Sequence, residues 1–128
     1  MAAIVEPTIE RWLTAPFRAD RAVARLRERL LSDDAADWSA GWRAIAGMSL
    51  TPHLGAVRAP TLVLAGERDV ATTPAMADAT VARAIPGARF AVRPGAPHMM
   101  QIETDAAFTL RETVTQMQRA AQTGDGHY

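Results

Sequence analysis

Residues 60–74 read PTLVLAGERDVATTP, and this stretch decides the fold class. Its first half, residues 61–65, is a continuous apolar run between a proline and a glycine. Such a run predicts a strand that is buried on both faces, as strands of parallel sheets are. Its second half is a polar loop that contains Asp69, and the final Thr-Pro pair predicts the first turn of a helix.

The sequence after this stretch repeats the same order of elements. The helix that begins at Thr73-Pro74 is predicted to reach Ile85, where Pro86-Gly87 stops it. Residues 88–93 predict a second strand. Thr104 is placed to cap a last helix, whose apolar stripe is formed by Ala107, Leu110, Val114, Met117 and Ala121. The order strand, helix, strand, helix predicts an α/β fold built on a βαβ unit with a right-handed crossover.

Two parallel strands do not form a stable sheet by themselves, because both faces and the edges need cover. We therefore expect further strands, either on another chain or on an N-terminal region that is absent from this sequence.

Before Pro60 the apolar residues recur at helical spacing, and no strand is predicted. Asp20 is placed to cap a second helix, and Asp33 or Asp34 a third. The three apolar faces consist of Ile9, Trp12 and Leu13; of Val23, Leu26 and Leu30; and of Trp38, Trp42 and Ile45. We interpret Trp38 and Trp42 as packed interior of this helical region rather than as ligand contacts. Thr51-Pro52 predicts the N-cap and first residue of a short turn that Gly55 ends.

The composition excludes several classes of protein. The 128 residues include 14 basic and 14 acidic side chains, so the net charge gives no reason to expect binding to nucleic acid or to an anionic membrane. The absence of cysteine excludes disulfides, a thiolate nucleophile and thiolate metal ligands. No apolar run approaches the roughly 20 residues of a membrane span, and no signal peptide is evident. A cytoplasmic protein is the expectation.

Asp69 and His98 each follow a predicted strand. In open α/β sheets, ligands bind beyond the carboxyl ends of the strands, and neighbouring parallel strands would bring these two loops together. A carboxylate that accepts the Nδ1 proton of an imidazole leaves the other nitrogen free to act as a general base. Each residue alone has an ordinary explanation, since Asp is common in turns and a loop histidine is commonly structural. Their shared position in the fold favours the catalytic interpretation.

The remaining polar residues suggest no second site. His53 falls in the short turn and His127 in the tail, and no two histidines have the spacing of a metal site. No metal ligand is therefore predicted. The arginines between Arg21 and Arg29 alternate with apolar positions, which is typical of a solvated helix face.

The pattern Gly-x-x-Asp followed by Gly-x-x-His resembles the last two catalytic elements of the α/β-hydrolase superfamily. Upstream, residues 10–17 (ERWLTAPF) and 58–66 (RAPTLVLAG) look like the 3-oxoadipate enol-lactonase branch. The resemblance implies that Asp69 is the acid and His98 the base of a catalytic triad, that Trp12 and Met99 contact substrate, and that no cofactor is required. One departure is that Glu103-Thr104-Asp105 stands where family members often have Glu-x-Pro.

The family's nucleophile lies in Gly-x-Ser-x-Gly, and this sequence lacks that motif. Its serines are Ser32, Ser39 and Ser49, all in the helical region. The oxyanion hole would also come from the absent part of the fold. The implied partner is thus the N-terminal half of the hydrolase, which would carry the serine.

These observations divide the chain into a helical lid (residues 1–55), the C-terminal part of a hydrolase core (56–121) and a flexible tail (122–128). The leading hypothesis is part of a serine hydrolase that acts on a small ester or lactone; the isolated chain would be inactive. An alternative is a non-catalytic remnant or interaction module of hydrolase descent. Related hydrolases also cleave C–C bonds or act as cofactor-free haloperoxidases, and fold alone does not choose among these.

Overall fold

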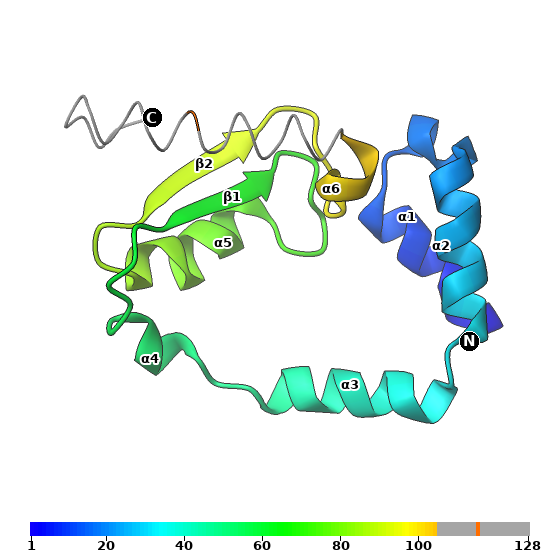
Figure 1. Ribbon diagram of the computed structural model, residues 1–128, viewed down its shortest axis with the longest axis horizontal. Coiled ribbons are helices and arrows are strands. Elements are labelled where there is room, and N and C mark those ends of the chain that lie inside the picture. Colours follow the sequence, from blue (N-terminus) through cyan, green and yellow to red (C-terminus); the bar gives the residue numbers. More distant parts are fainter. Residues whose placement is uncertain (105–114, 116–128) are drawn as a thin grey trace.

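The computed structural model describes residues 1–104 and residue 115. The elements, in chain order, are α1 (Ala2–Trp12), the 3₁₀ helix η1 (Ala15–Ala19), α2 (Arg21–Ser32), α3 (Ala35–Gly47), α4 (Thr51–Leu54), β1 (Leu62–Gly66), α5 (Pro74–Thr80), the 3₁₀ helix η2 (Ala82–Ala84), β2 (Arg89–Arg93) and α6 (Met100–Glu103). Residues 1–55 contain helices and no strand, as predicted. Figure 1 shows the helices α1 and α2 at one end of the molecule and the sheet at the other.

Helices α1 and α2 pack against each other through the apolar faces that the sequence predicted. Their buried cluster consists of Val5, Ile9, Leu13, Val23 and Leu30, with Leu26 partly buried against it. The carboxylate of Asp20 accepts a hydrogen bond from the backbone N–H of Ala22 at 2.7 Å, which confirms the predicted cap of α2. On the surface, Arg27 donates to Glu6 across the two helices, and this hydrogen bond lowers the pKa of Glu6. This helical unit therefore has its own small core.

Helix α3 begins at the predicted place, but its apolar face is not buried. Asp34 rather than Asp33 is its N-cap, accepting from the backbone N–H groups of Ala36 and Asp37. Trp38 packs against the α1–α2 cluster, whereas Trp42 is 51% exposed. The prediction that both tryptophans form packed interior is therefore wrong for Trp42. The reason is that α3 runs apart from α1 and α2 (Figure 1), so only its N-terminal part reaches their cluster.

The short helix α4 begins one residue earlier than expected. Its N-cap is Leu50, so the predicted cap at Thr51 is wrong. Gly55 ends the helix as predicted.

Strands β1 and β2 pair in parallel, which confirms the α/β fold class and the pairing expected of a βαβ unit. The register runs from Leu62 opposite Arg89 to Gly66 opposite Arg93. Helix α5 lies against the sheet on one side (Figure 1). Burial on both faces was predicted for all of β1, but only Ala65 and Gly66 are buried. The described sheet has two strands, so the first three residues of β1 stay half-exposed.

The crossover helix is shorter than predicted. Thr73 caps α5 by accepting from the N–H of Met76, as expected, but the α-helix ends at Thr80. After Val81 the chain continues as the 3₁₀ helix η2, which ends before Ile85. Tighter 3₁₀ geometry is common at helix C-termini. Ile85, the predicted last residue of the helix, instead has an extended backbone and is buried.

The last predicted helix and the tail at 122–128 lie outside the described residues, apart from Thr115, which is helical. No helix in residues 1–104 is long and apolar enough to cross a membrane.

Candidate active site

The loops that follow β1 and β2 are joined by hydrogen bonds that continue the strand pairing. The N–H of Glu67 donates to the carbonyl of Arg93 at 3.0 Å, and that of Arg68 donates to the carbonyl of Ala96 at 2.9 Å. The carboxylate of Glu67 accepts from the N–H of Gly95 at 2.7 Å. Because three hydrogen bonds link them, the two loops form one structural unit at the carboxyl end of the sheet.

Two glycines of the sequence pattern are required by the geometry of these loops. A Cβ on Gly66 would lie 2.4 Å from the carbonyl oxygen of Ala96 and 2.6 Å from that of Pro97. Gly95 has a φ of +69°, which side-chain-bearing residues rarely adopt. Gly66 therefore permits the close approach of the loops, and Gly95 permits the turn toward His98.

Asp69 is the buried acid of the site, at 8% exposure. Its Oδ1 accepts hydrogen bonds from the backbone N–H groups of Ala71 and Thr72, at 2.8 and 2.7 Å. Its Oδ2 lies 2.9 Å from Nδ1 of His98. One oxygen thus shapes the loop while the other faces the imidazole, so the loop itself determines where the carboxylate points.

His98 occupies the more open side of the pair. Its side chain is 30% exposed, against 7% for Asp69. An ionised carboxylate only accepts hydrogen bonds, so Nδ1 of His98 carries the proton and Nε2 of a neutral ring has a free lone pair. The predicted approach of the two loops is confirmed. The geometry is that of a general base held by a carboxylate.

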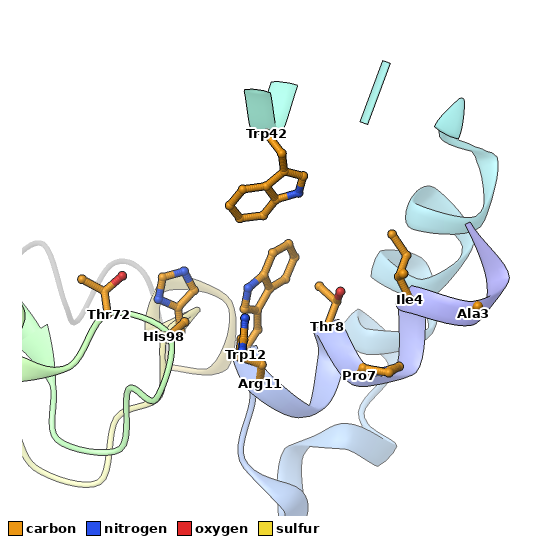
Figure 2. A pocket seen from close by; sticks show the side chains of 10 residues that line it. Ala3, Ile4, Pro7, Thr8, Arg11, Trp12, Trp42, Thr72 and His98 are labelled. Atoms are coloured by element: carbon orange, nitrogen blue, oxygen red, sulfur yellow. The ribbon is translucent and has the colours of Figure 1, made fainter. Parts of the chain in front are cut away.

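A cavity of about 530 Å³ opens beside the imidazole. Its walls come from α1, α3, the Asp69 loop and the His98 loop (Figure 2), and its lining residues are Ala3, Ile4, Pro7, Thr8, Arg11, Trp12, Trp42, Ala71, Thr72 and His98. The Trp12 and His98 ring centroids lie 6.2 Å apart at an interplanar angle of 34°. The cavity lining is mixed: aromatic and aliphatic side chains lie beside His98, two threonines and the charged Arg11.

The two residues predicted to contact substrate differ in their surroundings. Trp12 lines the cavity, in keeping with its predicted place. Met99 does not: it packs against the α1–α2 cluster, and its N–H donates to the carbonyl of Trp12 at 3.0 Å. Met99 directly follows His98, and its partly buried side chain packs against the helical core instead.

Several site residues were not predicted from sequence. Trp42 and Thr72 line the cavity, the Glu67 carboxylate joins the two loops, and the Glu103 carboxylate joins α6 to Thr14. The one sequence signal at these positions is the Glu-x-Pro pattern of the family, where this chain has Glu103-Thr104-Asp105. The contacts themselves join residues far apart in the chain and have no local signature.

Among the described residues, no serine lines the cavity and no group of three potential metal ligands occurs. Ser32, Ser39 and Ser49 are all exposed in the helical region. Within residues 1–104, the site therefore pairs a carboxylate with an imidazole but contains no serine.

Comparison with known structures gives two strong matches. An enol-lactonase from Burkholderia xenovorans LB400 is 31% identical, with a TM-score of 0.78 over 93% of this chain and 45% of the enol-lactonase. A thermophilic esterase from Thermogutta terrifontis, in a malate-bound structure, is 28% identical, with a TM-score of 0.73 over 90% of this chain and 44% of the esterase. No family model and no curated protein matches the sequence.

The fold and the comparisons together place this chain in the α/β-hydrolase superfamily, as a part that resembles the C-terminal portion of that fold. Within that superfamily it resembles an enol-lactonase and an esterase, and it spans less than half the length of either.

Proposed function

We propose that this chain contributes the acid, the base and the substrate-covering helices of a serine hydrolase that acts on a small carboxylic ester or lactone. The nucleophilic serine and the oxyanion hole lie on the N-terminal half of the fold, outside this sequence. The observation that carries the proposal is the 2.9 Å contact between Oδ2 of Asp69 and Nδ1 of His98 beside a cavity of about 530 Å³.

In the assembled enzyme the serine hydroxyl attacks the carbonyl carbon of the substrate, and Nε2 of His98 takes its proton. Asp69 holds the ring and stabilises the imidazolium. The tetrahedral intermediate collapses, His98 returns the proton to the departing alkoxide, and an acyl-enzyme is left. Water then attacks the acyl group with His98 again as base, which releases the acid and regenerates the serine.

The cavity favours a small substrate with an apolar body. Its volume lies in the usual range of small-molecule sites, and Trp12 and Trp42 contribute aromatic surface. Arg11 adds one positive charge to the lining, which suits a substrate that carries a carboxylate. The names of the two matched structures, an enol-lactonase and an esterase, support ester or lactone chemistry.

The proposal is tested by labelling the protein, purified from its native source, with a fluorophosphonate that reacts with activated serines. We expect one labelled serine in a Gly-x-Ser-x-Gly sequence, on a co-purifying chain or on an N-terminal extension of this one. Label on Ser32, Ser39 or Ser49 would contradict the proposal, as would a pure unlabelled chain. In that last case Asp69 and His98 are remnants of a hydrolase ancestor.

Variants then separate the roles of the two residues. We expect His98→Ala to abolish labelling. We expect Asp69→Asn to lower the rate of labelling about 10⁴-fold, because the imidazole ring would lose its carboxylate acceptor. Asparagine can still accept from the N–H groups of Ala71 and Thr72 through its amide oxygen, so the loop should keep its shape. Glu28→Gln, a change on the exposed face of α2, is the matched control and should retain full labelling.

A further inference from the structure

We infer that Glu103 is a positioning residue that holds the end of α1, and with it Trp12, against His98. Oε2 of Glu103 accepts a hydrogen bond from the backbone N–H of Thr14 at 3.0 Å, and Oε1 accepts from the Thr14 hydroxyl. The two residues are 89 positions apart in the chain. One carboxylate thus joins the helix after the histidine loop to the helical region.

The hydrogen bond to Glu103 gives the backbone N–H of Thr14 an acceptor at the junction between α1 and η1. Helix α1 ends at Trp12, and Thr14 is the N-cap of η1 without a side-chain capping bond of its own. Both Thr14 and Glu103 are half-buried, where a backbone N–H without a partner would be costly. A charged acceptor also makes stronger hydrogen bonds than a neutral one. Glu103 is therefore well suited to fix this junction.

A second contact places the junction directly beside the imidazole. The carbonyl of Trp12 accepts from the N–H of Met99, the residue after His98, at 3.0 Å. Both contacts lie directly after His98, at Met99 and at Glu103, and they join that segment to the end of α1. They explain how the Trp12 ring is kept 6.2 Å from the imidazole although α1 and the sheet belong to opposite ends of the chain (Figures 1 and 2).

The consequence for a reaction is that the wall of the cavity and the base move as one unit. Loss of the Glu103 carboxylate would let the end of α1 shift relative to His98, and small displacements of positioning groups have large effects on rate. The effect on rate rests on the proposed hydrolase function, whereas the effect on the Trp12–His98 geometry does not.

The geometry is tested first, by NMR of the protein as isolated with any co-purifying chain and with its histidine rings labelled with carbon-13. The indole of Trp12 shifts the ring-proton resonances of His98, while His53 serves as an internal reference. We expect Glu103→Ala to move the His98 resonances toward their values in a Trp12→Leu variant. Thr14→Val, which removes only the side-chain bond, should give a smaller shift in the same direction.

Glu103→Gln is the rescue variant, because its amide can still accept from the Thr14 N–H and donate to the Thr14 hydroxyl oxygen. We expect it to restore the wild-type His98 resonances, and Glu28→Gln to leave them unchanged. Wild-type resonances in Glu103→Ala would overturn the inference. So would equal shifts in Glu103→Ala and Glu103→Gln, since these would indicate a general loss of structure. If Glu103→Ala does not fold, Thr14→Val alone decides.

Kinetics with p-nitrophenyl acetate as the probe ester complete the test. We expect Glu103→Ala to lower kcat/KM by about tenfold or more, mainly through KM, with recovery in Glu103→Gln. If the wild-type protein hydrolyses no ester while the His98 resonances still respond to Glu103→Ala, the proposed function fails and the positioning role stands. Unchanged kcat/KM in an active Glu103→Ala enzyme would overturn the catalytic importance of the contact.

Discussion

At the scale of single residues, the site depends on groups that serve backbone structure and chemistry together. Asp69 shapes its loop with Oδ1 and faces His98 with Oδ2. Gly66 allows the carbonyl groups of the His98 loop to approach β1. A change at either residue therefore alters the sheet edge and the site together.

Gly66→Ala should be strongly destabilising. The added Cβ would meet two backbone oxygens closer than 3.0 Å, and backbone cannot rotate away as a side chain can. We expect a loss of about 2 kcal/mol or more in the free energy of unfolding, measured by urea denaturation, and a displaced His98 loop. Gly41→Ala is the control: nothing lies within 4 Å of its Cβ, and the helix should gain roughly 0.5–1 kcal/mol. Equal stabilities of the two variants would contradict this account of Gly66.

Arg11→Gln tests the charge of the cavity. If the guanidinium binds a substrate carboxylate, its loss should raise KM for an ester that carries a carboxylate by about tenfold, the equivalent of about 1.4 kcal/mol. KM for p-nitrophenyl acetate, which has no such charge, should change little. The same change in KM for both esters would show that Arg11 contributes shape rather than charge.

Sequence reasoning reached Asp69 and His98 because both follow strands, and parallel strands put their carboxyl ends at one edge. It did not reach the Glu103–Thr14 bond, since nothing local relates two residues 89 positions apart. It placed Met99 beside the substrate from the family resemblance, but the Met99 side chain packs against the α1–α2 cluster. Residue type and order were thus predictable, and side-chain direction was not.

At the scale of elements, caps and apolar spacing located the helices well. They could not show whether a helix face is covered, because that depends on its neighbours. Helices α2 and α3 both have an apolar face and an Asp cap, yet Val23 and Leu30 are buried in α2 while α3 has no buried residue. The same limit explains why the burial of β1 differed from expectation.

The contrast between α2 and α3 predicts different effects of the same cap removal. Asp20→Ala should lower the free energy of unfolding by about 1 kcal/mol, because α2 contributes buried residues to the core. Asp34→Ala should leave the global value nearly unchanged and speed amide hydrogen exchange within α3 only. Urea denaturation and hydrogen exchange measure the two effects. Equal losses of global stability in both variants would mean that α3 unfolds together with the core.

At the scale of the whole molecule, the described chain leaves apolar surface and sheet edges open. Trp42, Ile45, Met48 and Leu50 are each more than half exposed along the segment from α3 to α4. The two-stranded sheet has helix α5 on one side, and among the described residues each strand has one neighbour. Open edges and apolar patches of this kind are usually covered by another surface. In the matched hydrolases more than half of the chain lies outside the aligned part, which is enough to supply that cover.

A polypeptide of these 128 residues alone should therefore self-associate. We expect light scattering after size exclusion to show dimers or larger species at micromolar concentration, because exposed side chains such as Ile45 and Met48 gain free energy by leaving water. Replacing Ile45 and Met48 by Glu should shift the population toward monomer, whereas Glu28→Gln should not. Addition of the chain that carries the nucleophile should replace the self-associated species of the wild type by a complex of the two chains. It should also restore ester hydrolysis. A dilute wild-type monomer with one cooperative unfolding transition would show that the open surface needs no partner, and that the requirement for the other half of the fold is chemical rather than structural.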